Sequence, residues 1–221
     1  MHNSVDKLNS IKMEILDILK GMNKDPDAVN IIAVSKTFPI NDVFPLINHG
    51  HTHFGENKIQ EAMEKWTDIK NDFPHIQLHM IGKLQSNKVK YAVSLFDYIH
   101  SVDNLKLAEK ISKEQTKQKK KIKIFIQINI GDEYQKSGIH IDDIGNFYKT
   151  CTDKLGLNVI GLMCLPPENQ EVLPYFLKIN DLNDKLALGD LSIGMSNDYL
   201  VALKCNATFI RIGSKIFGSR S

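Results

Sequence analysis

Hydrophobic positions follow two spacings that alternate along the whole chain. From Val5 to Lys20 the apolar residues recur every three or four positions, which predicts an amphipathic helix ending at Gly21. Ile31 to Val34 is instead an unbroken apolar run, as expected of a strand that is buried on both faces of a sheet. The chain switches between these two patterns from end to end.

The same pattern predicts eight strands with helices between them. Strands are expected near residues 31, 52, 77, 98, 122, 158, 191 and 208, and helices over 41–49, 57–69, 86–95, 103–118, 141–150, 171–186 and 196–204. Strict alternation predicts a parallel sheet, and eight such units in 221 residues fit a single-domain (β/α)8 TIM barrel over residues 1–221. An open doubly wound sheet is the alternative, but the segment 35–39 lacks its glycine-rich turn.

Local signals define the expected ends of several elements. Ser86 and Asp103 are the expected N-caps of the helices that they precede. The clearest strand spans 121–130, where isoleucine occupies every second position. Gln127 and Asn129 share one face of it and are expected to point into the barrel, where polar groups need hydrogen-bond partners.

Composition narrows the function classes. A net charge of +2 gives no general attraction to nucleic acid or to an anionic membrane, and the basic run 117–123 is expected to be a solvated helix end. No apolar run approaches the ~20 residues of a membrane span. The three cysteines form no CxxC pair and no secretory leader follows Met1, so a reduced, cytoplasmic protein is expected.

Lys36 is the first candidate for chemistry, because it ends the apolar run of the first strand. Such a lysine is usually a surface charge. Where it is desolvated, however, its pKa falls and its lone pair becomes available for a Schiff base with an aldehyde.

The loops after strands seven and eight carry groups suited to an anion, as is common in TIM barrels. Ser196 is expected where a helix begins, and the amides of Gly213 and Ser214 could complete an anion nest. Two alternatives remain open. Gly213 and Ser214 could form an ordinary turn, and Arg211 could pair with a barrel carboxylate such as Glu56.

Barrel closure makes the first and last strands neighbours, so Lys36 is expected beside Arg211. An amine that can form a Schiff base with an aldehyde, next to an anion site, suggests pyridoxal 5′-phosphate (PLP) as the ligand. Asn57 is a candidate to hydrogen-bond a ring substituent, unless it caps the next helix. The alternative ligand is an unrelated sugar phosphate, which would give Lys36 no aldehyde to meet.

His51, His53 and Cys164 suggest other chemistry less strongly. The two histidines are expected on one face of a short strand. No carboxylate stands at a spacing that would complete a metal site, so the two are expected not to bind a metal. Cys164 is expected to be a buried, inert thiol.

Seven groups of residues, in order, carry a resemblance to a known family. They are Ala33–Thr37; Phe54–Asn57; His79–Gly82 with Leu84–Lys88; Gln127–Asn129 with Glu133–Gly138; Gly161–Met163; Leu191–Asp198; and Arg211–Gly213 with Ile216–Arg220. Together they resemble the pyridoxal 5′-phosphate homeostasis proteins, which are similar to the N-terminal barrel of bacterial alanine racemase.

The resemblance implies a role for each candidate residue. Lys36 would form the Schiff base with PLP, Arg211 would face the pyridine nitrogen, Ser196, Gly213 and Ser214 would hold the phosphate, and Asn57 would lie near the ring. The implied function is intracellular storage, buffering or delivery of PLP, with PLP-dependent apoenzymes as possible recipients. No metal is implied.

The resemblance also bears on catalysis. Alanine racemase takes a second proton-transfer residue from an additional domain of the partner chain, whereas this sequence ends at Ser221, directly after the predicted barrel. No catalytic residues, no robust enzymatic activity and a monomer are therefore expected. The alternative is a weak PLP-dependent amino-acid racemase.

Overall fold

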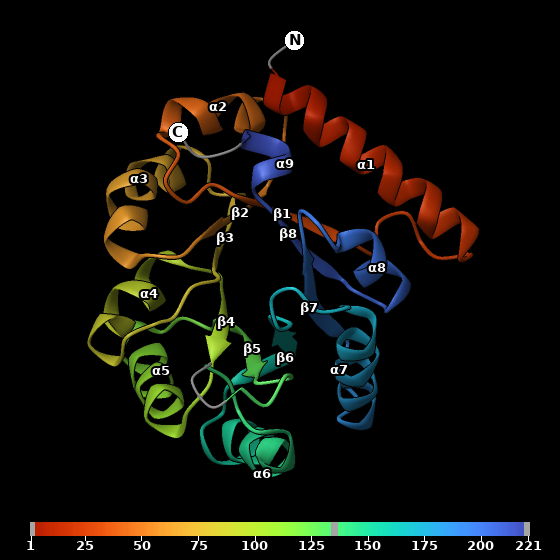
Figure 1. The fold of residues 1–221 in the computed structure, drawn as a ribbon. Helices are drawn as coiled ribbons and strands as arrows, with labels where there is room; N and C mark the ends of the chain where they lie inside the picture. The colour runs from red at the N-terminus through yellow and green to blue at the C-terminus, as the bar shows by residue number, and fades with distance from the viewer. Residues whose placement is uncertain (1–2, 134–136, 219–221) are drawn as a thin grey trace.

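Within residues 3–133 and 137–218, which the computed structural model describes, eight parallel strands close into a barrel (Figure 1). The strands follow one another around the barrel in chain order: β1 (Asn30–Val34), β2 (His53–Glu56), β3 (Gln77–Met80), β4 (Tyr98–Val102), β5 (Lys123–Ile128), β6 (Asn158–Cys164), β7 (Asp190–Met195) and β8 (Phe209–Ile212). The predicted (β/α)8 barrel is confirmed.

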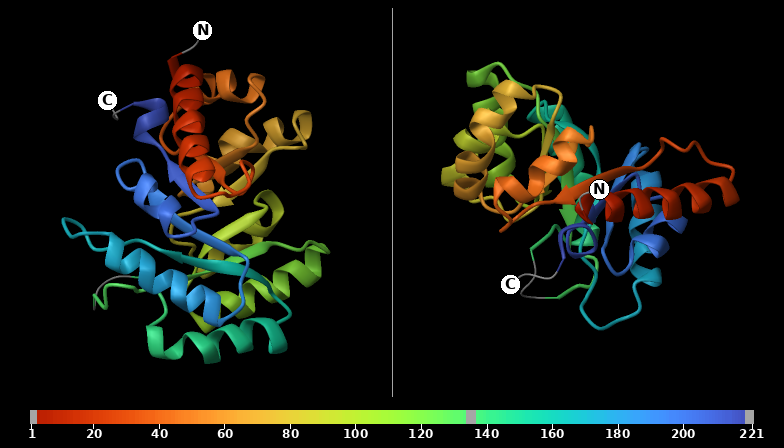
Figure 2. Two further views of the ribbon diagram at one scale, coloured as in Figure 1. Left: turned by 90° about the vertical axis from the view of Figure 1, so that its right-hand side faces the viewer. Right: turned by 90° about the horizontal axis from the view of Figure 1, so that it is seen from above.

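Helices form a ring outside the strands (Figure 1). They are α1 (Asn3–Gly21), α2 (Ile40–Asn48), α3 (Ile59–Asp72), α4 (Val89–Leu95), α5 (Leu105–Gln118), α6 (Ile144–Lys149), α7 (Leu173–Lys185), α8 (Tyr199–Lys204) and α9 (Ser214–Phe217). The first helix, α1, contacts both α8 and α9, so the two ends of the described chain pack together beside β8 (Figure 2).

The barrel wall separates two hydrophobic layers. Alternate residues of each strand face the helices, where they form the larger core. The apolar inward residues form a smaller core, composed of Ile32, Val34, Tyr98, Phe125, Met163 and Phe209. Side chains therefore fill the barrel interior, as is typical of the fold.

Several predicted boundaries were wrong, each for a local reason. The strand expected over 121–130 ends at Ile128, because the Asn129 side chain bonds the backbone of Glu133 in both directions and turns the chain. Asp103 does not cap α5; Asn104 does, by accepting a hydrogen bond from the amide of Leu107 at 2.9 Å.

Two further corrections concern helix starts. Ser86 makes no side-chain cap and begins a 3-10 turn, Ser86–Lys88, before α4. Ser196 does not begin a helix, since α8 starts three residues later, at Tyr199. Tyr134–Lys136 and Ser219–Arg220, which belong to the segments that carry the resemblance, lie outside the described residues.

Candidate functional site

A cavity of about 810 Å³ is lined by the loops that follow several of the strands. All six residues predicted to bind a cofactor line it: Lys36, Asn57, Ser196, Arg211, Gly213 and Ser214. Residues 165–170, which follow β6, also line it. Groups that are far apart in the sequence thus share one cavity.

Pairing of β1 with β8 accounts for the proximity of Lys36 and Arg211. The register aligns Ile32 with Arg211 and Ala33 with Ile212, so the two strands run side by side to their carboxyl ends. Lys36 lies two residues after the end of β1 and is partly buried. The expected closure between the first and last strands is confirmed.

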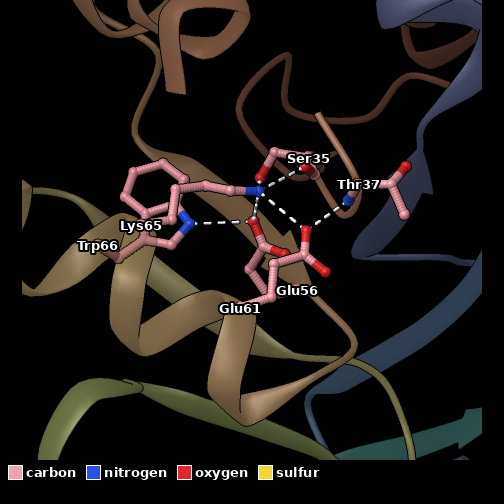
Figure 3. A network of polar contacts seen from close by, with 6 residues as sticks. All are labelled: Ser35, Thr37, Glu56, Glu61, Lys65 and Trp66. Atoms are coloured by element: carbon pink, nitrogen blue, oxygen red, sulfur yellow. Dashed lines mark hydrogen bonds and ion pairs between the residues drawn. The ribbon is translucent and has the colours of Figure 1, made fainter. Parts of the chain in front are cut away.

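Ser35, the residue before Lys36, is anchored by a buried carboxylate (Figure 3). Glu56 is fully buried, and its Oε1 accepts hydrogen bonds from Ser35 Oγ at 2.8 Å, from Trp66 Nε1 at 3.0 Å and from Lys65 Nζ at 2.9 Å. Lys65 also donates to the carbonyl of Ser35 at 2.9 Å. The residue before Lys36 is therefore tied to α3 through both its side chain and its backbone.

The residue after Lys36 is tied to the same helix. Thr37 has a φ of 69°, a conformation that is costly for a β-branched residue. Its amide donates to Glu61 Oε1, and Glu61 also pairs with Lys65 at 3.2 Å (Figure 3). Since α3 holds both neighbours, the position of Lys36 is set by this helix as well as by β1.

This network rules out the proposed pairing of Arg211 with Glu56. Along β2, residues alternate between the barrel interior and the helix layer, and Glu56 lies on the helix side with Phe54, which packs on Trp66. Arg211 lies on the inner side of β8. Among the described residues, the ion pair that Glu56 makes is with Lys65.

Arg211 is held by oxygen atoms of the barrel interior. It is 5% exposed, and it donates to the Ser192 carbonyl at 2.7 Å, to Ser192 Oγ at 2.6 Å and to the Cys164 carbonyl at 3.0 Å. Burial lowers the pKa of the guanidinium, but arginine stays protonated in proteins. No carboxylate of the described chain pairs with it, so the cavity has a fixed positive charge in its wall.

Ser196 does not begin α8, but its hydroxyl lies at the start of α9, whose N-cap is Gly213. Its Oγ lies 3.3 Å from the amide nitrogen of Gly213 and 3.5 Å from that of Lys215, and both amides donate toward it. At Gly213 a Cβ would come no closer than 3.5 Å to another heavy atom, and φ is not positive. Neither packing nor backbone conformation requires glycine here, which is consistent with close approach of a ligand from the cavity.

Asn57 supplies an acceptor that lacks a partner in the protein. Its Oδ1 is buried without a hydrogen bond, although the Asn57 side chain borders the cavity. It does not cap α3, whose N-cap is Lys58 without a side-chain bond. A buried polar atom left in this state fits a ligand that brings a donor. The cavity therefore offers an amine, a cation, an amide-lined loop and an acceptor, a set that suits an anionic aromatic aldehyde.

Of the residues considered for other chemistry, Cys164 and His51 are buried and His53 is half-buried. Burial raises the pKa of the Cys164 thiol to about 12, so this thiol is unreactive at neutral pH. Burial lowers the pKa of His51 to about 3 and that of His53 to about 4. No group of three His, Cys, Asp or Glu side chains among residues 3–133 and 137–218 is arranged to hold a metal ion.

Comparison with known proteins gives consistent matches. The family model described as "Alanine racemase, N-terminal domain" matches residues 8–221. A pyridoxal phosphate homeostasis protein of Aquifex aeolicus is 34% identical over 99% of both chains, and one of Haemophilus influenzae is 33% identical over 99% of this chain and 97% of its own. The solved structure of PipY from Synechococcus elongatus PCC7942 with PLP bound is 32% identical, with a TM-score of 0.81, over 92% of this chain and all of its own.

A search for membrane spans found no helix in the described part of the chain that is both long and apolar enough to cross a bilayer.

The Glu56 network predicts a strong coupling between two buried side chains. Replacing Lys65 with Met should lower the free energy of unfolding by about 3 kcal/mol, because a fully buried carboxylate loses its cation. Adding Glu56→Gln should recover part of the loss, and urea denaturation of the wild type, both single variants and the double variant measures the coupling. Additive effects of the two substitutions would show that the pair is not coupled.

Buried histidines predict loss of stability in mild acid. The unfolded chain binds protons at His51 and His53 below their ordinary pKa of about 6.5, whereas the folded protein binds them only near pH 3 to 4. Stability should therefore be complete above about pH 6.5 and fall as the pH drops toward 4, by up to about 1.4 kcal/mol per pH unit for the buried His51. The test is the urea midpoint of unfolding, measured at several pH values between 4 and 7. His51→Phe should make this midpoint depend less steeply on pH than in the wild type. A wild-type midpoint that does not change with pH would contradict the prediction.

Proposed function

Because the chain belongs to the alanine racemase N-terminal domain family and, within it, to the pyridoxal phosphate homeostasis proteins, we propose that it binds PLP and takes part in PLP homeostasis. The PLP bound to PipY, which matches this chain over 92% of its length, supports the choice of ligand. The proposal extends to a monomer in the cytoplasm that stores, buffers or delivers PLP, with PLP-dependent apoenzymes as recipients.

One observation carries the proposal: Lys36, Arg211 and the Ser196 loop contacts border the same cavity. In the bound state Lys36 would form a Schiff base with the aldehyde. The hydroxyls of Ser196 and Ser214 and the amide of Gly213 would hold the phosphate. Asn57, with its unpartnered Oδ1, would accept a hydrogen bond from the ring hydroxyl.

Arg211 argues against robust catalysis. When bound, PLP can act as an electron sink for amino-acid chemistry, and it does so best with a protonated pyridine nitrogen. A guanidinium cannot accept a proton, and its charge disfavours protonation of a nitrogen beside it. Arg211 would therefore bind the ring while leaving it a poor electron sink, which suits a protein that holds and releases the cofactor.

The test is the absorption spectrum of the reconstituted protein. The wild type plus PLP should show the yellow band of a Schiff base, and borohydride should fix the label covalently. Lys36→Ala should show neither, whereas Lys83→Ala, which removes an exposed lysine next to the cavity residue Gly82, should behave as the wild type.

Two outcomes would contradict the proposal. An unchanged band in Lys36→Ala would exclude this lysine as the attachment site. Rapid incorporation of solvent deuterium at Cα of free amino acids would favour the weak racemase instead.

A further inference from the structure

Three histidines in consecutive strands form a hydrogen-bonded line through the barrel interior. His53 Nδ1 lies 2.9 Å from His79 Nε2, and His79 Nδ1 lies 2.9 Å from His100 Nε2. His100 Nδ1 in turn lies 2.9 Å from Ser192 Oγ, which accepts from Arg211. The line begins at β2 and ends at the guanidinium that borders the cavity.

Stacking fixes the planes of the two inner rings. His79 stacks on Tyr98 with centroids 4.1 Å apart, and His100 stacks on Phe125 at 4.3 Å. Both histidines are fully buried, while His53 is partly exposed. The nitrogen atoms therefore face one another in a fixed geometry.

Arg211 dictates the direction of every hydrogen bond in this line. A guanidinium only donates, so Ser192 Oγ must accept from it. Ser192 Oγ has a second lone pair, but if it also accepted from His100 Nδ1, its own proton would be buried without an acceptor among the described residues. The serine therefore donates to His100 Nδ1. A neutral imidazole carries one N–H, which places it on Nε2 of His100. The same logic then puts it on Nε2 of His79 and of His53.

The rings must be neutral for this pattern to hold, and their surroundings favour that state. Burial, followed by the charges of neighbouring groups, lowers the pKa of His79 and His100 well below the ordinary value. Arg211 lies at one end, and Lys123, which donates to Tyr98 Oη at 2.8 Å, lies near the other. A proton added to either ring would be repelled by Arg211 on one side and by Lys123 on the other.

We propose that His100, His79 and His53 are positioning residues for Arg211, forming a one-way hydrogen-bond chain that keeps its guanidinium turned toward the cavity. Ser192 becomes a better acceptor for Arg211 when it donates its own proton to His100, because hydrogen bonds in a chain polarise one another. The role toward a ligand rests on the proposed function, whereas the direction of the chain is a property of the protein without PLP.

The first test uses the protein without PLP. ¹⁵N NMR of the histidine rings at neutral pH should find His53, His79 and His100 neutral, each with its proton on Nε2. His53→Phe should leave His79 and His100 in that form. His100→Phe, which keeps the stack on Phe125, should release His79 and His53 into mixed forms, because the direction is imposed from the Arg211 end. A proton on Nδ1 of His100, a charged ring, or equal effects of the two variants would overturn the proposal.

The second test measures the effect on the site. His100→Phe should weaken PLP binding by about fivefold, the equivalent of one hydrogen bond, and shift the pH profile of the bound cofactor's absorption. His51→Phe is the matched control, since His51 is also buried but bonds the backbone of His53 and of Ile31 and none of the three rings. His79→Phe interrupts the same line of hydrogen bonds and serves as the second variant if His100→Phe does not fold.

The outcomes separate the two proposals. If the wild type binds PLP, and His100→Phe and His79→Phe leave the PLP affinity and the pH profile of the bound cofactor's absorption unchanged, the positioning role is wrong. If the wild type does not bind PLP, the proposed function fails, while the NMR result still decides whether the chain is directional.

Discussion

The pairing of β1 with β8 is the contact on which the candidate site depends. Lys36 and Arg211 are separated by most of the sequence, and only closure of the barrel aligns Ile32 with Arg211. In an open sheet the two strands would lie at opposite edges, and the amine and the guanidinium would not share a cavity. The contact of Ser196 with the loop after β8 follows instead from the pairing of β7 with β8.

Strand alternation then supports the two key side chains from opposite sides of the wall. On the helix side of β2, Glu56 binds Lys65 and Trp66 of α3 and anchors the residue before Lys36. On the inner side of the same strand, His53 begins the line that ends at Arg211. The lysine is thus fixed through the outer layer and the arginine through the barrel interior. Both networks are buried, so each makes its side chain costly to displace.

Much of this arrangement could be predicted from the sequence, and the exceptions share a cause. The periodic pattern predicted the barrel, and the rule that chemistry follows the carboxyl ends of strands selected six residues that line one cavity. Pattern alone does not give cross-strand register. The line of histidines was therefore missed, although a histidine at an inward position in each of three consecutive strands was a readable signal. The partner of Glu56 was missed because Lys65 lies on α3, and the pattern does not show which helix residue reaches a strand. The errors at Asp103 and Ser196 arose because several polar residues precede each helix, and the sequence does not show which of them lies at its start.

The central claim is that Lys36 is the amine that holds the cofactor. The most direct measurement is mass spectrometry of peptides from the protein reduced with borohydride in the presence of limiting PLP. The account predicts the reduced pyridoxyl phosphate mass on the peptide that contains Lys36 and not on Lys65, whose amine is committed to Glu56 and to the Ser35 carbonyl. A label on another lysine, or one spread evenly over exposed lysines, would contradict it.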